Sequence, residues 1–299
     1  MSNYNIKKIN IFFRFWKESL FVAAVILIKL FDKSCITLTP TSSSPEVHSL
    51  VCKKHLYFYL LAIKSFLSFN TSFYVVIHDD GSLTKKEIKV INKHIIGCRI
   101  ILQSEADKTL ASILKRYPRI VKYREQYVNA KQILDFFLLS KSKKIIGLDS
   151  DILFFKQPHE IYDWSFNVSK SIFYSFEKDS YGPNLVNAFF GCQPYLKNIN
   201  IGLMGGFSSL ISLPFIEEKL SMLKNDDWWT GQMLLSILIP KLTIDFFPLP
   251  SSRYICRNLR QKAVMKHYFL SHGVRYEYIL DIICTIKRLN KLFCPSFRS

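Results

Sequence analysis

The chain has 299 residues, of which 49% are hydrophobic and 15% aromatic, with only 10 Gly and 11 Pro. A composition this rich in apolar side chains excludes a disordered chain, a collagen-like repeat and a low-complexity scaffold. Because 41 Lys and Arg stand against 23 Asp and Glu, the formal net charge is +18. This charge either attracts a partner such as nucleic acid, anionic lipid or a phosphate-bearing substrate, or belongs to a lysine-rich surface that keeps an aromatic-rich chain soluble. The seven Cys include no CxxC pair, so we expect neither a disulfide framework nor a structural zinc site.

The first part of the chain, residues 1–46, predicts a basic and apolar helical extension followed by a linker. Its apolar run, residues 20–28, is shorter than the roughly 20 residues that a membrane-spanning helix needs, and no small-residue cleavage site follows it cleanly. Residues 9–31 instead predict a helix with basic and apolar faces, which either packs on the protein or lies on a membrane surface. The Ser/Thr/Pro-rich residues 35–46 predict the linker.

Residues 47–278 predict the main domain, in which strands alternate with helices. In chain order we expect a strand at 47–52, a helix at 55–69, a strand at 73–77, a helix at 84–96 that starts with a Thr84–Glu87 capping box, a strand at 99–102, helices at 105–117 and 123–140, and a strand at 145–148. Such alternation predicts an α/β fold whose mostly parallel central sheet is flanked by helices. Ligands of such sheets bind at the carboxyl ends of the strands.

Two carboxylates, Asp149 and Asp151, interrupt the apolar run of residues 145–155. Their i, i+2 spacing places both on one side of an extended chain, with their heads close together. Two partly desolvated anions at short range repel each other, and a bound divalent cation removes that conflict. The pattern therefore predicts a site for Mg²⁺ or Mn²⁺ with places left for phosphate oxygens. The alternative is that Asp149 caps a turn and Asp151 faces solvent.

The segment KKIIGLDSDILFFKQPHEI resembles the DxD strand of GT-A-fold glycosyltransferases, in particular the glycogenin/galactosyltransferase-like families that use nucleotide-sugar donors. Further segments match in order over residues 47–278. They are FYVVIHDDGSLT, NAKQILDFFLL with Lys131, NINIGLMGG with Asn200 and Gly202, WTGQ with Gln232, and KHY with Lys266 and His267, followed by Arg275. The resemblance implies a GT-A-like fold with a less regular, acceptor-facing C-terminal part.

The resemblance also implies the activity: a metal-dependent glycosyltransferase that moves a sugar from a nucleotide-diphosphate donor, expected to be a UDP-sugar, to a hydroxyl acceptor, with surface glycan synthesis as the expected setting. It implies that Asp149, Asp151 and His267 hold Mn²⁺ or Mg²⁺, and imidazole beside two carboxylates favours Mn²⁺. The donor-binding residues that it implies are Lys131, Asp149, Asp151, Asn200, Gly202, Lys266 and Arg275.

One position departs from the family pattern. The family often carries an acid directly before the Gln of the WTGQ-like segment, whereas this chain has Gly231 there. Gln232 remains a candidate catalytic residue through hydrogen bonding, and Asp227 is the candidate replacement for the missing acid. The alternative for Asp226 and Asp227 is that they cap the helix that follows them.

Residues 279–299 predict a basic amphipathic helix at the other end of the chain. Two basic amphipathic ends predict peripheral contact with a membrane, so we expect a cytoplasmic protein that can lie against the inner face of the membrane. We expect no specific nucleic-acid partner, because no nucleic-acid-binding motif is present. Two alternatives stay open: a haloacid-dehalogenase-like phosphatase that uses the DxD as nucleophile and acid/base, and a non-enzymatic basic protein that binds nucleic acid or lipid.

Overall fold

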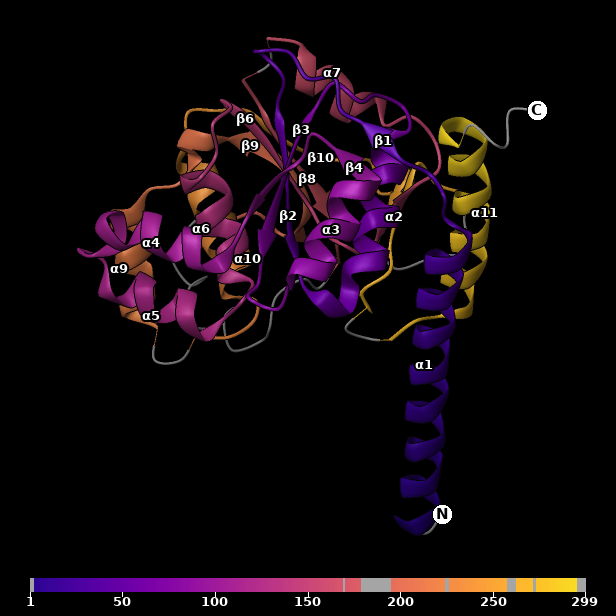
Figure 1. Ribbon diagram of the computed structural model, residues 1–299. Helices are drawn as coiled ribbons and strands as arrows, with labels where there is room; N and C mark the ends of the chain where they lie inside the picture. Colours follow the sequence, from indigo (N-terminus) through magenta and orange to yellow (C-terminus); the bar gives the residue numbers. More distant parts are fainter. Residues whose placement is uncertain are drawn as a thin grey trace.

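The structure is a computed structural model that describes residues 3–168, 170–178, 195–223, 226–256, 262–270 and 273–294, with side chains from residue 16 onward. At the centre of this described part lies a seven-stranded sheet in the order β10-β8-β9-β6-β2-β3-β5 (Figure 1). Its strands are Glu46–Val51 (β2), Tyr74–Asp79 (β3), Arg99–Ile101 (β5), Lys144–Leu148 (β6), Ile172–Phe176 (β8), Ile199–Phe207 (β9) and Phe246–Pro248 (β10). β9 is antiparallel to both of its neighbours, and all other neighbouring pairs are parallel. The predicted α/β fold with a mostly parallel sheet is confirmed.

Helices cover both faces of the sheet (Figure 1). Along β6 the side chains alternate: Ile145 is buried among residues of α6 and α10, and Ile146 among residues of α2. The α-helices of the described part are Asn3–Phe31 (α1), Leu56–Leu67 (α2), Lys85–His94 (α3), Gln103–Leu114 (α4), Pro118–Gln126 (α5), Ala130–Leu138 (α6), His159–Phe166 (α7), Leu213–Met222 (α9), Thr230–Leu238 (α10) and Tyr276–Phe293 (α11). Single 3₁₀ turns occupy Lys53–His55, Ser208–Leu210 and Ile239–Lys241, and the short strands β1 (Ile36–Thr37) and β4 (Ile95–Ile96) pair with each other.

The predicted helix at 123–140 is wrong, because two helices occupy this region. Pro118 starts α5, where its missing N–H costs nothing, and the chain becomes extended at Tyr127 before α6 begins. This break places Asn129 at the N-cap of α6. The capping box at the start of α3 is confirmed, since Glu87 accepts from the backbone N–H of Thr84 at 3.0 Å.

The two terminal helices lie side by side (Figure 1). The second half of α1 packs on the body through Ala24 and Ile28, which are buried with Phe58 of α2 and with Tyr278 and Ile282 of α11. The first half of α1 extends beyond the body (Figure 1). No helix in the residues that the structure describes is long and apolar enough to cross a bilayer. The division of the chain at residues 46 and 278 stays a prediction.

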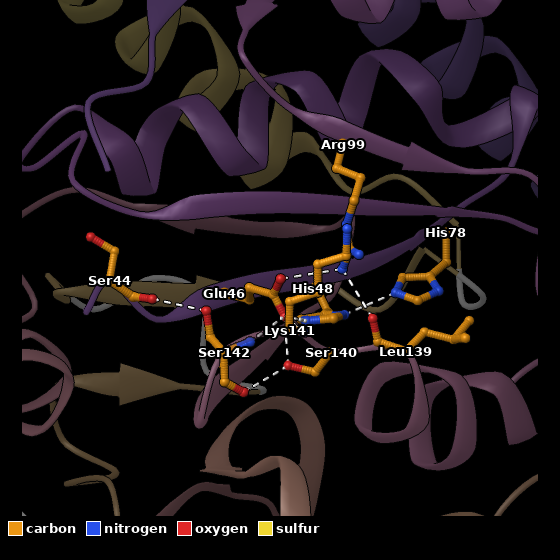
Figure 2. A network of polar contacts seen from close by, with 9 residues as sticks. All are labelled: Ser44, Glu46, His48, His78, Arg99, Leu139, Ser140, Lys141 and Ser142. Carbon is orange, nitrogen blue, oxygen red and sulfur yellow. Dashed lines mark hydrogen bonds and ion pairs between the residues drawn. The ribbon is translucent and has the colours of Figure 1, made fainter. Parts of the chain in front are cut away.

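At the amino end of β2, the buried carboxylate of Glu46 ties two strands, β2 and β5, to the loop before β6 (Figure 2). It accepts hydrogen bonds from His48 Nε2 at 3.1 Å, Ser140 Oγ at 2.5 Å, the Lys141 backbone N–H at 2.9 Å and Arg99 at 3.2 Å. Burial alone would raise the pKa of Glu46, but the donors from His48 and Ser140 outweigh burial and lower that pKa to about 2.

We expect Glu46→Gln to lower the free energy of unfolding at pH 7 by about 2–3 kcal/mol, because the folded protein stabilises the charged carboxylate. Since the pKa of Glu46 is lower in the folded than in the unfolded chain, this stabilisation is complete above about pH 4.5 and is lost as the pH falls towards 2. Urea unfolding across this range measures it. Glu125→Gln, at an exposed position of α5, is the matched control. An equal loss in both variants would contradict this account of Glu46.

Candidate active site

The candidate site lies at the carboxyl end of β6, where a second, smaller sheet begins. β7 (Ile152–Phe154) pairs antiparallel with β12 (Met265–His267), which pairs in turn with β11 (Tyr254–Ile255). The register sets His267 opposite Ile152, and the backbone N–H of Tyr268 donates to the carbonyl of Asp151 at 3.0 Å. This pairing brings a segment more than a hundred residues away in the sequence directly onto the DxD.

Asp149, Asp151 and His267 converge as the sequence predicts. His267 Nε2 lies 3.0 Å from Asp151 Oδ1 and 3.6 Å from Asp149 Oδ2. One ligand atom from each residue lies within 4.8 Å of the others, and in the described part of the chain no second group of three such residues is arranged in this way. Two carboxylate oxygens and one imidazole nitrogen form a ligand set that suits a small divalent cation.

The other oxygen of each carboxylate is fixed by the protein. Gln132 Nε2 of α6 donates to Asp149 Oδ1 at 2.7 Å, and the backbone N–H of Leu270 donates to Asp151 Oδ2 at 2.7 Å. These bonds leave Asp149 Oδ2 and Asp151 Oδ1 turned towards His267. Our sequence analysis missed Gln132; its only signal was its position next to Lys131 in a segment already singled out.

The charges within the cluster balance one another. Burial raises the pKa of Asp149 to about 6, although His267 opposes the rise. For Asp151, burial acts in the same direction, but His267 prevails and lowers the pKa. Burial would lower the pKa of His267, yet Asp151 and Asp149 together raise it well above its usual value. These shifts favour a positively charged His267 beside the two carboxylates, and a metal cation bound there would balance the same negative charge.

Asn200 and Gly202 lie against the cluster on β9. The backbone N–H of Asp149 donates to the carbonyl of Gly202 at 2.8 Å, and the N–H of Gly202 donates to Asn200 Oδ1 at 2.9 Å. A Cβ at position 202 would lie 2.6 Å from His267 Cε1 and would clash with Asp149 Oδ2. Only glycine leaves room for the cluster at this position.

Glu177, a buried acid that our sequence analysis missed, follows β8 directly and extends the site. Its Oε2 accepts from Asn200 Nδ2 at 2.6 Å, and its charge contributes to the raised pKa of Asp149. The signal in the sequence was the one that revealed Asp149: an acid directly after an apolar strand, here in IFYSFE.

Of the two predicted catalytic residues, the structure brings Gln232 to this site. Gln232, on α10, accepts from the backbone N–H of Ile201 at 3.2 Å and thereby holds the Asn200–Gly202 segment. Asp227 instead accepts from the backbone N–H of Trp229 at 2.8 Å and contacts the hydroxyl of Thr230 at 3.3 Å. The N-cap of α10 is Trp229, which has no side-chain cap hydrogen bond, so Asp227 contacts the first turn of the helix without being its cap.

The three predicted donor-binding cations have different surroundings. Lys131 is buried, with its Nζ 3.5 Å from the carbonyl of Asp80, after the carboxyl end of β3. Lys266 points to the opposite face of β12 from His267 and pairs with Asp281 of α11 at 2.8 Å. Arg275 is exposed immediately before α11. Lys131 is thus at the sheet edge, whereas the structure does not bring Lys266 and Arg275 onto the Asp–Asp–His cluster.

Comparisons with solved structures agree with this architecture. The chain is similar to the galactosyltransferase LgtC, solved in complex with donor and acceptor sugar analogs, with a TM-score of 0.55 and 10% sequence identity over 85% of this chain and 99% of that chain. It is also similar to the bifunctional glycosyltransferase WbbM in its apo form, with a TM-score of 0.54 and 12% identity over 86% of this chain and 53% of that chain. No model of a protein family matches the sequence, and no curated protein matches it. The fold expected from the DxD segment is therefore confirmed: this chain has a GT-A glycosyltransferase fold.

Proposed function

We propose that this protein is a metal-dependent glycosyltransferase that moves a sugar from a nucleotide-diphosphate donor to a hydroxyl acceptor. The observation that carries the proposal is the convergence of Asp149, Asp151 and His267 at the carboxyl end of β6. In open α/β sheets this edge is where ligands bind. The fold is similar to that of solved glycosyltransferases, which supports sugar transfer as the reaction at this group of side chains.

The residues present fit a bound divalent ion. Asp149 Oδ2, Asp151 Oδ1 and His267 Nε2 would be its protein ligands. The ion would stabilise the charge that develops on the departing nucleoside diphosphate. Mn²⁺ suits the imidazole better than Mg²⁺ does. Because a ligating imidazole is neutral, His267 would hold the ion through a deprotonated Nε2.

The residues beside the cluster would hold the donor sugar. Gln232 and Asn200 fix the backbone of residues 200–202 against the cluster. Gly202 has no side chain that would fill the space beside Asp149 and His267. Glu177 places a negative charge next to it, which would stabilise positive charge on the sugar ring as the bond to the diphosphate breaks. UDP is the nucleotide that we propose, on the sequence resemblance alone.

We propose a cytoplasmic location and a role in surface glycan synthesis for this activity. In the described part of the chain, Cys35, Cys52, Cys98, Cys256 and Cys284 form no disulfide, which supports a reducing compartment. The net charge of +18 supports a substrate or surface that carries negative charge.

The phosphatase alternative requires a second acidic pair beside the DxD. Asp226 instead pairs with Arg119 at 3.5 Å, and Asp227 is bound to the first turn of α10. In the part of the chain that the structure describes, neither acid is seen to contact the DxD, so this pair does not supply the second half of a phosphatase site. The non-enzymatic alternative leaves the convergence of Asp149, Asp151 and His267 without a role.

A thermal-shift panel of nucleotide sugars with and without Mn²⁺ tests the proposed function. A donor at about a hundred times its Kd adds roughly 2.7 kcal/mol, so we expect a rise in Tm of about 5 °C that requires the metal. Asp151→Asn keeps the shape but removes a ligand charge, and should abolish the rise. Asp163→Asn, exposed on α7, should behave as the wild type. No metal-dependent rise with any donor would refute the proposal.

Gly202→Ala tests whether the ion binds at the three-residue cluster. Because the added Cβ meets His267 and Asp149, we expect the affinity for Mn²⁺ to fall at least about tenfold in calorimetric titration. Gly206→Ala, on the same strand, is the matched control, since its added Cβ lies at an ordinary 3.4 Å from Leu210. Unchanged Mn²⁺ affinity in Gly202→Ala would place the ion elsewhere.

Glu177→Gln separates charge from hydrogen bonding next to the cluster. The amide oxygen of the variant still accepts from Asn200, so a purely structural role predicts normal activity. We expect kcat to fall about tenfold or more while the affinity for Mn²⁺ and the KM for donor change little, because the charge acts on the transition state. A steady-state assay of donor turnover measures this, and an unchanged kcat would remove Glu177 from the mechanism.

A further inference from the structure

One side of α1 exposes a stripe of apolar side chains. Val22, Ile26 and Leu30 recur every four residues and are 55%, 48% and 54% exposed, while Ala24 and Ile28 on the opposite side are buried. Residues at this spacing share one face of a helix, so the stripe is continuous. A helix that is apolar on both sides but covered on only one still has an apolar face to bury. We refer to Trp16, Val22, Ile26, Lys29 and Leu30 as the α1 face.

The charge around this stripe identifies its partner. α1 carries Lys7, Lys8, Arg14, Lys17 and Lys29 against a single acid, Glu18. Trp16, on the same helix, is 56% exposed. Basic residues, an indole and an apolar stripe on one helix are the combination that binds the surface of an anionic bilayer. A second copy of this chain fits less well, because two surfaces with this excess of positive charge repel each other.

The same helix lies next to the candidate active site. A Cβ at Gly273 would lie 2.8 Å from the Lys17 side chain, and nearby Leu270 donates its backbone N–H to Asp151. One turn further along α1, the ring of Phe21 lies 5.9 Å from the ring of His55. Burial lowers the pKa of His55, and the charge of the nearby Asp151 opposes that shift. A surface that binds α1 is therefore held beside the metal ligands.

We propose that the α1 face docks on a bilayer of anionic phospholipid and presents the active site to an acceptor carried by that membrane. The docking is independent of the chemistry, whereas the acceptor class rests on the proposed function. The contact is peripheral: apolar side chains enter the headgroup boundary and lysines meet the lipid phosphates. The projecting half of α1 continues the basic helix beyond the body (Figure 1).

Vesicle co-sedimentation of the full chain tests the docking. We expect binding to vesicles of phosphatidylglycerol and phosphatidylethanolamine, weak binding to phosphatidylcholine alone, and a loss of binding as salt increases. Ile26→Glu should weaken binding about tenfold or more. Ile113→Glu, on α4, is the matched control because Ile113 is 41% exposed and lies outside the α1 face. A second pair of variants repeats the test with exposed charges that contribute little to folding. Lys29→Glu should weaken binding, and Lys108→Glu is its control.

Two results would overturn the proposal. The first is wild-type affinity for anionic vesicles in both Ile26→Glu and Lys29→Glu. The second is that the wild type does not bind vesicles, forms a dimer in light scattering, and becomes a monomer in Ile26→Glu. That result would make the stripe a contact between two copies of the chain. Both α1 variants should keep the metal-dependent stabilisation by donor. Vesicle binding without any stabilisation by a nucleotide sugar would leave the docking intact and remove the proposed function.

Discussion

The antiparallel pairing of β7 with β12 is the constraint on which the candidate site depends. Asp149 and Asp151 are local neighbours, but their third partner comes from a segment far along the chain, and the register that sets His267 opposite Ile152 delivers it. The close approach of β9 at Gly202 completes the arrangement. A shift of this register by one residue would turn His267 to the other face of β12 and leave two carboxylates without a cation.

The parallel strands carry a buried carboxylate at one end and a partly buried carboxylate at the other, and the surroundings of the two differ. Glu46, at the amino end of β2, accepts hydrogen bonds from several side chains and from backbone N–H groups. Its charged form is therefore stable and its pKa is low. Asp149, at the carboxyl end of β6, has one oxygen held by Gln132 and the other turned towards His267 and Asp151, and its pKa is raised. The first carboxylate is satisfied by hydrogen bonds from the fold, whereas His267 balances the charge of the second, in a group of side chains that can also hold a metal cation. This contrast separates a structural network from a site that can bind an ion.

The sequence allowed the local parts of this structure to be predicted. Apolar runs located β2, β3, β5 and β6, and the i, i+2 spacing of Asp149 and Asp151 indicated a shared face. The pairing of β7 with β12 is non-local and has no signal in periodicity, so His267 was expected only through the resemblance to glycosyltransferases. Gln132 and Glu177 were missed because a single polar residue in an amphipathic helix or after a strand is ordinary until the tertiary structure places it. The break between α5 and α6 was hidden because the apolar pattern continues across it.

The most direct test of the ion site is a crystal structure of the full chain soaked in Mn²⁺, with diffraction recorded at the manganese absorption edge. We expect one strong anomalous peak at about 2.0–2.3 Å from Asp149 Oδ2, Asp151 Oδ1 and His267 Nε2. His267 should then face the metal and no longer hydrogen-bond to Asp151. A map without a peak at this position, with His267 still paired to Asp151 at millimolar Mn²⁺, would contradict the account.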